Sequence, residues 1–327
     1  MKGKLMLDGF DPTVEGKHLY DLRPLVPADD TLKEDVICII RNGEGPTALL
    51  CGGIHGDEYE PQVILRQLID EIAVEDVRGR LIIIPTINPP ASQRGSRVST
   101  IDGQNMNRSF PGNAEGTGTE RLSAFLHDVV FPLTDLLVDV HSGGGDYFVV
   151  PMIFGFTGPE CGVDEAGLDR IMDGWGYPIV QYVEGIASTS AGASPLVGVA
   201  SVEIEGGGGR AVKSSELAIM REGILRGLHA YGVLATGPGG MSRPPIRVAV
   251  SAENNHAAPS EGLIEHRVDL HDRVEAGDLL AVLHPAAGRT GAALEIRANG
   301  PGIVLRQRAR FFVGKGELIC GTGNLRM

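Results

Sequence analysis

Apolar and polar residues follow two kinds of pattern along the chain, and the first occupies residues 35–237. There, short runs rich in β-branched residues alternate with longer segments in which apolar residues recur at helical spacing. This alternation is typical of an α/β domain with a parallel or mixed sheet. The predicted strands are Val36–Arg41, Ala48–Gly52, Leu81–Thr86 and Leu136–His141, and the predicted helices are Gln62–Ile72, Thr119–Val130 and Ser214–Tyr231.

The pattern changes at a segment rich in glycine and proline. Residues 235–245 can neither continue a helix nor pair as a central strand. We therefore predict a domain of residues 1–237, a linker of residues 238–245 and a smaller all-β domain of residues 246–327. The β-rich runs of the last part, separated by turns, are Gly262–Asp269, Leu279–His284, Ala293–Ala298, Gly302–Leu305 and Glu317–Cys320.

Composition restricts the class of protein. The 327 residues suffice for one large and one smaller domain, and 42% hydrophobic content suffices for packed cores. The formal net charge of -13 disfavours nucleic acid as a partner, because its phosphates would be repelled. The sequence has neither an apolar run of signal-peptide length at its start nor a stretch that could cross a bilayer, so we expect a cytoplasmic protein without membrane contact. Reduced, buried thiols are expected for Cys38, Cys51, Cys161 and Cys320.

Three residues have the chemistry of a zinc site with an open coordination position. His55 and Glu58 lie three positions apart, between a predicted strand and the next helix, so both side chains can point to one side. A His-x-x-Glu pair alone usually marks a solvated helix start, but His141 ends a second predicted strand, and strand ends are where open α/β sheets bind ligands. Two imidazoles and one carboxylate leave a fourth position for water. Asp139 faces the same side of its strand as His141 and is expected to support it.

The ordered motifs of the chain resemble those of the succinylglutamate desuccinylase/aspartoacylase family, within the zinc carboxypeptidase superfamily. The resemblance covers nearly the whole chain and is closest to the branch of N-acetyl-diaminobutyrate deacetylases. It implies a zinc-carboxypeptidase-like mixed sheet flanked by helices, and hydrolysis of the amide bond of a small N-acylated amino acid. The motifs are Gly53–Glu58, Arg97–Gly112, Asp139–Gly144 and a glutamate before a run of glycines.

The resemblance also implies roles for individual residues. It makes His55, Glu58 and His141 the ligands of one zinc ion per chain. Arg97 matches the arginine that polarises the scissile carbonyl, where a permanent positive charge stabilises the developing oxyanion. Asn107 and Arg108 match the pair that holds a substrate carboxylate, for which a planar guanidinium is suited.

Two glutamates are candidates for the general base, the carboxylate that accepts a proton from zinc-bound water and passes it to the leaving amine. In Ser201–Glu205 the residues alternate as in a strand, so Glu203 and Glu205 face the same side. The family pattern is a glutamate, an apolar residue and then glycines, which Glu203 fits better, whereas Glu205 directly precedes the glycines. We favour Glu203 as the base and keep Glu205 as the alternative, with a substrate contact as its other role.

The sequence also has features of a carrier domain and of a carboxypeptidase. The Gly-Asp turns of the last 80 or so residues resemble those of biotinyl and lipoyl carrier domains, but residues 285–291 lack the lysine that a carrier needs. We therefore expect a barrel-sandwich-like fold without carrier function, and we rank a non-catalytic binding protein lowest. A metallocarboxypeptidase acting on small peptides would use the same zinc and arginines. In an acyl-diaminobutyrate substrate, Glu205 or Asp146 could pair with the free ammonium. The sequence leaves the oligomeric state, including a homo-oligomer, open.

Overall fold

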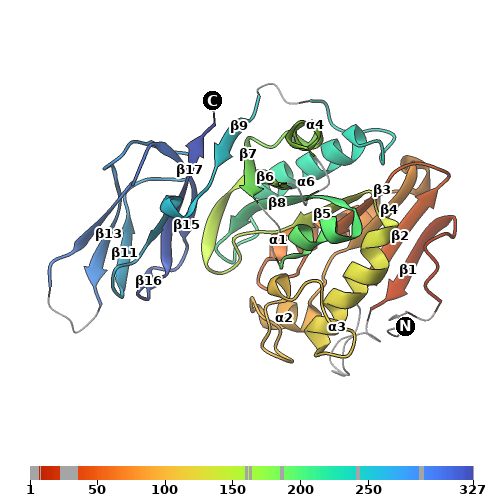
Figure 1. The fold of residues 1–327 in the computed structure, drawn as a ribbon, viewed down its shortest axis with the longest axis horizontal. Helices are drawn as coiled ribbons and strands as arrows, with labels where there is room; N and C mark the ends of the chain where they lie inside the picture. The colour runs from red at the N-terminus through yellow and green to blue at the C-terminus, as the bar shows by residue number, and fades with distance from the viewer. Residues whose placement is uncertain are drawn as a thin grey trace.

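The architecture is a long mixed sheet with helices on both faces (Figure 1). The computed structural model describes residues 7, 9–22, 36–158, 161, 164–184, 188–240, 244–286 and 291–326. Its sheet contains both parallel and antiparallel pairs, as the alternating sequence pattern predicts. From one edge, the strands run in the order β1 (Gly16–Asp21), β2 (Val36–Asn42), β4 (Gly79–Ile84), β3 (Thr47–Cys51), β5 (Leu136–Val140), β8 (Ala200–Gly208), β6 (Tyr147–Thr157) and β7 (Ile179–Glu184).

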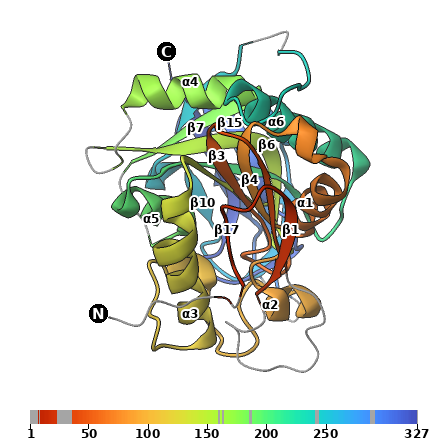
Figure 2. The ribbon, with the colours of Figure 1, turned by 90° about the vertical axis from the view of Figure 1, so that its right-hand side faces the viewer.

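Alternate residues of the central strands enter two separate cores. In β3, Leu50 packs in one core and Leu49 in the other, because successive side chains of a strand point to opposite faces. Helices α1 (Tyr59–Glu71), α4 (Glu165–Trp175) and α6 (Ser214–Ala230) cover the first face, and α3 (Gly118–Phe125) and α5 (Ser190–Ala193) cover the second (Figure 2). The remaining helical segments are α2 (Pro89–Arg94) and the short turns Val74–Asp76, Met106–Arg108, Leu126–Val130, Phe131–Leu133, Ser194–Val197 and Ala252–Asn254.

All predicted strands and helices of the first part are present, with ends displaced by a few residues. The helix predicted to reach Val130 is α-helical only to Phe125 and then continues as a wider π-helical turn. Strands β6 and β7 and helix α4 were not predicted. Their segment carries Pro151, Gly155 and Gly174, which interrupt the hydrophobic periodicity from which strands and helices are predicted.

Apart from the short helical turn Ala252–Asn254, the regular elements among the described residues after residue 245 are all strands, as predicted. Four of these strands form a separate sheet, in the order β14-β13-β11-β16, but β9, β17, β15 and β12 extend the main sheet. Because β15 also pairs with β6, the strands β6, β7, β9, β17 and β15 close into a ring. The bounds are β9 (Ile246–Ala249), β10 (Asn255–Ala257), β11 (Gly262–His266), β12 (Arg273–Val274), β13 (Leu279–Pro285), β14 (Leu294–Arg297), β15 (Gly302–Arg308), β16 (Phe312–Val313) and β17 (Leu318–Leu325).

The structure also bears on the cysteines, on membrane-spanning helices and on the division into domains. All four cysteines are buried and free of disulfides, as expected. Among the described residues, no helix combines the length and apolar character needed to cross a bilayer. The division into two domains stays a prediction, because the main sheet continues from one part into the other.

Candidate metal centre and active site

Two histidines and a glutamate meet beyond the carboxyl ends of β3 and β5. Glu58, the residue before α1, places one carboxylate oxygen 2.7 Å from His55 Nδ1 and the other 2.8 Å from His141 Nδ1. The backbone N–H of Ser142 donates to the second oxygen at 3.2 Å. All three side chains are buried, with exposed fractions of 2%, 2% and 5% for His55, Glu58 and His141. The structure thus brings together the predicted ligand set from two separate elements.

Local backbone packing fixes the loop that carries His55. A Cβ atom at Gly56 would lie 1.9 Å from the carbonyl carbon of Ala91, so only glycine lets the loop approach α2 this closely. Next to it, the carboxylate of Asp57 accepts the N–H of Gly145 at 2.8 Å, which joins this loop to the one after β5. The two ligand-bearing loops therefore hold each other in place.

The outward nitrogens of both histidines face oxygen acceptors. Asp139 Oδ2 lies 3.0 Å from His141 Nε2, as its place on the strand predicted, and also accepts the hydroxyl of Ser190. Asn105 Oδ1 lies 3.1 Å from His55 Nε2. An acceptor on one ring nitrogen keeps the proton there and leaves the other nitrogen free to bind a metal. In both rings the free nitrogen is the Nδ1 that faces Glu58.

Charge accounts for the protonation of the cluster. Burial alone would raise the pKa of Glu58, but the adjacent imidazoles of His55 and His141 hold it well below its ordinary range. Burial alone would lower the pKa of His141, yet the carboxylates of Asp139 and Glu58 raise it well above its ordinary value.

The donor set fits a zinc ion. One ligand atom from each of His55, Glu58 and His141 lies within 4.8 Å of the other two. Asp139, His141 and Glu203 form a second such group, but Asp139 already accepts from Ser190 and contacts the outward nitrogen of His141. The first group is therefore the better site, since it offers two imidazole nitrogens and one carboxylate, a ligand set found in hydrolytic zinc centres.

The arginines and the asparagine named by the resemblance lie around this cluster. Arg97 Nη1 donates to Glu58 Oε1 at 3.1 Å, and its side chain is 46% exposed. Asn107 is buried, and its side-chain oxygen accepts the N–H of Ser190 at 2.9 Å. Arg108 is exposed and donates to the backbone carbonyl of Asn107. Asn107 and Arg97 thus have partners within the site, whereas the guanidinium of Arg108 donates to a neighbouring backbone carbonyl.

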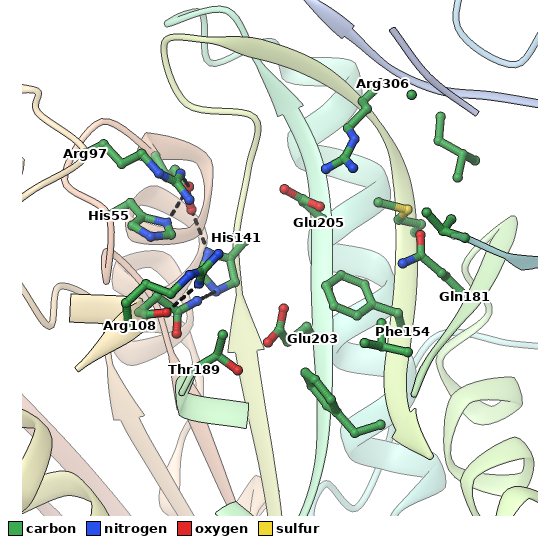
Figure 3. A pocket seen from close by; sticks show the side chains of 18 of the residues that line it. His55, Arg97, Arg108, His141, Phe154, Gln181, Thr189, Glu203, Glu205 and Arg306 are labelled. Carbon is green, nitrogen blue, oxygen red and sulfur yellow. Dashed lines mark hydrogen bonds and ion pairs between the residues drawn. The ribbon is translucent and has the colours of Figure 1, made fainter. Parts of the chain in front are cut away.

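Glu203 and Glu205 both lie on β8 and face the cluster, as the alternation predicted (Figure 3). Glu203 pairs in register with Asp139 of β5, and one of its carboxylate oxygens is buried without a hydrogen-bond partner among the described residues. Burial, with the nearby Asp139 and Glu205, raises the pKa of Glu203 to about 8. Glu205 is half-buried, and burial raises its pKa as well.

These side chains line one cavity of about 300 Å³, which the end of the chain helps to enclose. Gln181 of β7 and Phe154 of β6 lie on the side away from the histidines, and Arg306 of β15 points in from the same side (Figure 3). Asp146 is not among the cavity residues and pairs instead with Arg310 at 2.7 Å. An ammonium group bound in the cavity would therefore meet Glu205 rather than Asp146.

Residues 44–231 match the model of the succinylglutamate desuccinylase/aspartoacylase catalytic domain. The chain belongs to this family. It is 32% identical over 285 residues, 86% of this chain and 83% of the relative, to N-alpha-acetyl-L-2,4-diaminobutyric acid deacetylase of Halomonas elongata. The family assignment makes the protein an enzyme, an amidohydrolase for linear amides.

Solved structures of the desuccinylase/aspartoacylase family share the fold over nearly their whole length. The product-bound ectoine utilization protein EutE (DoeB) of Ruegeria pomeroyi is 31% identical, with 99% of each chain covered and a TM-score of 0.88. A succinylglutamate desuccinylase/aspartoacylase of Rhodobacter sphaeroides is 28% identical, with 97% of this chain and 98% of that one covered and a TM-score of 0.87. The similarity therefore includes the all-β part that follows residue 245.

Several residues at the site were not predicted from the sequence. Asn105 lay within a quoted motif, and its position two residues before Asn107 is the only signal that could have indicated it. Ser190, Gln181 and Arg306 follow no motif. They reach the site only because β7, α5 and β15 are brought there by the fold.

Proposed function

We propose that this protein is a zinc-dependent hydrolase of the amide bond of a small N-acylated amino acid, with Glu203 as general base. The observation that carries the proposal is the convergence of His55, Glu58 and His141 in a small cavity that also holds Arg97 and two glutamates. Family membership supports the reaction class.

The metal would be held by Nδ1 of His55, Nδ1 of His141 and the carboxylate of Glu58. A zinc ion bound there would supply a Lewis acid that lowers the pKa of bound water to roughly 7. The acceptors Asp139 and Asn105 support this reading, because they fix the tautomer that both ligand nitrogens require.

The proton steps belong to Glu203 of β8. Glu203 has a buried oxygen without a partner, which leaves an acceptor available for the proton of the attacking water. The same carboxyl then returns the proton to the leaving amine. Arg97 stands beside Glu58 at the cavity, where its charge would stabilise the oxyanion that develops on the scissile carbonyl.

The size of the cavity and its charges indicate the substrate class. A volume of about 300 Å³ suits a small molecule rather than a long peptide. Asn107 and Arg108 are retained, from the resemblance, as the groups that hold the substrate carboxylate. N-acetyl-diaminobutyrate is the reference candidate, because a relative is named for it.

A metallocarboxypeptidase acting on small peptides is the second candidate, since the metal ligands and arginines would serve it equally. Leu305, Arg306 and Thr322, from the end of the chain, line the cavity and restrict the space beyond the reacting centre. This enclosure favours the deacylase.

The decisive experiment measures amine release by the zinc-loaded protein from N-acetyl, N-succinyl and N-formyl amino acids, with short peptides in parallel. We expect one zinc per chain, hydrolysis of at least one acyl amino acid, and little release from peptides. Glu203→Gln should keep its zinc and lose roughly 10² to 10⁴ in rate, the usual contribution of a general base.

The matched variants separate the roles. His55→Ala should lose zinc and activity together. If Glu205→Gln abolished turnover while Glu203→Gln retained it, the base would be Glu205. Failure of every acyl amino acid, with cleavage of dipeptides, would replace the deacylase by the peptidase.

A further inference from the structure

The cavity wall away from the histidines carries charged and polar side chains that the proposed reaction does not use. Glu205 of β8, Gln181 of β7 and Arg306 of β15 all line this wall, which we name the far wall (Figure 3). Arg306 comes from the all-β part of the chain and points toward Glu205 (Figure 3). A negatively charged and a positively charged side chain, Glu205 and Arg306, thus face the same cavity from distant segments of the chain.

The two charges face each other without touching. Among the described residues, Glu205 has no hydrogen-bond or ion-pair partner, and Arg306 has one, the side-chain oxygen of Asn255 at 2.9 Å. Burial raises the pKa of Glu205, and the charge of Arg306 acts against that rise, so the guanidinium lies within electrostatic reach. The space between them suits a group that offers a donor to one and an acceptor to the other.

Arg306 is held in this position by its surroundings. A Cβ atom at Gly321 would lie 2.6 Å from Nε and 2.7 Å from Cγ of Arg306, so glycine on β17 leaves room for the arginine side chain. The hydrogen bond that Arg306 donates to Asn255 fixes one end of the guanidinium. Its remaining N–H groups are free to point into the cavity.

We propose that Glu205 and Arg306 form the subsite for the side chain of the acylated amino acid, and that Arg306 is a specificity-determining residue favouring an uncharged carboxamide. The amide nitrogen donates to Glu205, and the amide oxygen accepts from Arg306. Gln181 adds a further donor and acceptor on the same wall. This inference rests on the proposed function.

Charge decides between the competing side chains. A side-chain ammonium would pair with Glu205 but face the like charge of Arg306, and a carboxylate would pair with Arg306 but face Glu205. Only an uncharged group with donor and acceptor satisfies both partners. A side-chain ammonium would require negative charge alone, whereas the far wall also carries the positive charge of Arg306.

The test compares three substrates that differ in side-chain charge: N-acetyl-L-asparagine, N-acetyl-L-aspartate and N-acetyl-L-2,4-diaminobutyrate. The zinc-loaded wild type should hydrolyse the asparagine derivative with the highest kcat/KM. Arg306→Met should lower that value roughly tenfold, mainly through KM, and raise the value for the diaminobutyrate derivative, because one charge-assisted hydrogen bond is lost and one repulsion is removed. Glu205→Gln should shift the preference toward aspartate.

Matched variants guard against a general structural effect. Gly321→Ala should shift the preference as Arg306→Met does, because the added Cβ displaces the arginine. Arg267→Met is the control, since Arg267 lies in the same part of the chain, pairs with Glu265 at 2.8 Å and does not line the cavity. It should leave the preference of the wild type unchanged.

Calorimetry separates this proposal from the proposed function. Zinc-loaded protein is titrated with free asparagine and free 2,4-diaminobutyrate, so binding is measured even if no amide is hydrolysed. Tighter binding of asparagine, lost in Arg306→Met, supports the subsite. A wild type that prefers the diaminobutyrate compound, with a ratio that Arg306→Met leaves unchanged, overturns it.

Discussion

Individual residues around the metal ligands show how much of the site depends on groups that touch neither metal nor substrate. Asp139 is fully buried and lies between the hydroxyl of Ser190 and the outward nitrogen of His141. A buried carboxylate is costly unless it is paired, and the partners of Asp139 are the Ser190 hydroxyl and the His141 ring. Asp139 fixes the orientation of the His141 ring and increases the basicity of the imidazole.

Asp139→Asn should therefore weaken zinc binding by about 10- to 100-fold, the usual effect of removing an acceptor behind a histidine ligand. Competition with a chromogenic chelator measures the affinity. The control is Ser201→Ala, which removes a buried hydroxyl that donates to the carbonyl of Ala191 at 2.8 Å, away from His141. Equal zinc affinity in Asp139→Asn and the wild type would contradict the role.

Among the structural elements, the loop between β3 and α1 is closely constrained by its packing. It carries two proposed metal ligands, His55 and Glu58, within four residues and passes within contact of α2 at Gly56. Its sequence must therefore satisfy the metal geometry and a backbone contact at once. Substitution at Gly56 tests this element rather than the ligands themselves.

Gly56→Ala should lower the free energy of unfolding by about 1–3 kcal/mol, as overpacking does, and should weaken zinc binding because the loop must shift. Urea titration of the zinc-free protein and chelator competition give the two values. Gly239→Ala is the matched control, since no atom lies within 4 Å of an added Cβ there. An equal loss of stability and zinc affinity in Gly56→Ala and Gly239→Ala would argue against a specific contact between Gly56 and α2.

In the whole molecule, the predicted boundary at residues 238–245 is crossed by hydrogen bonds and by a shared core. Strand β15 pairs with β6, and β17 pairs with β9, which itself pairs with β7. Val149 and Ile179 of the first part pack in one cluster with Val248, Ile303 and Leu305 of the second. This continuity brings Leu305, Arg306 and Thr322 of the second part to a cavity that the first part mostly builds.

We therefore expect one cooperative thermal transition for the full chain. Ile303→Ala should cost about 2–5 kcal/mol, as truncation of a buried Ile does, and should lower the midpoint of that single transition. Leu294→Ala, at a side chain that is 42% exposed, is the control. Scanning calorimetry with two resolved transitions, only the lower one displaced by Ile303→Ala, would show instead that the two parts unfold separately.

The sequence by itself determined the alternation of elements, the candidate ligand set and the family. Local spacing carries this information: a strand followed by His-x-x-Glu places His55 and Glu58 at a helix start, and the period of two puts Asp139 beside His141. The tertiary structure alone decided the rest, because Ser190, Gln181 and Arg306 reach the site through sheet pairings between distant segments. No local pattern contains the register that joins β15 to β6, so the wall facing the metal ligands could be seen only in the folded chain.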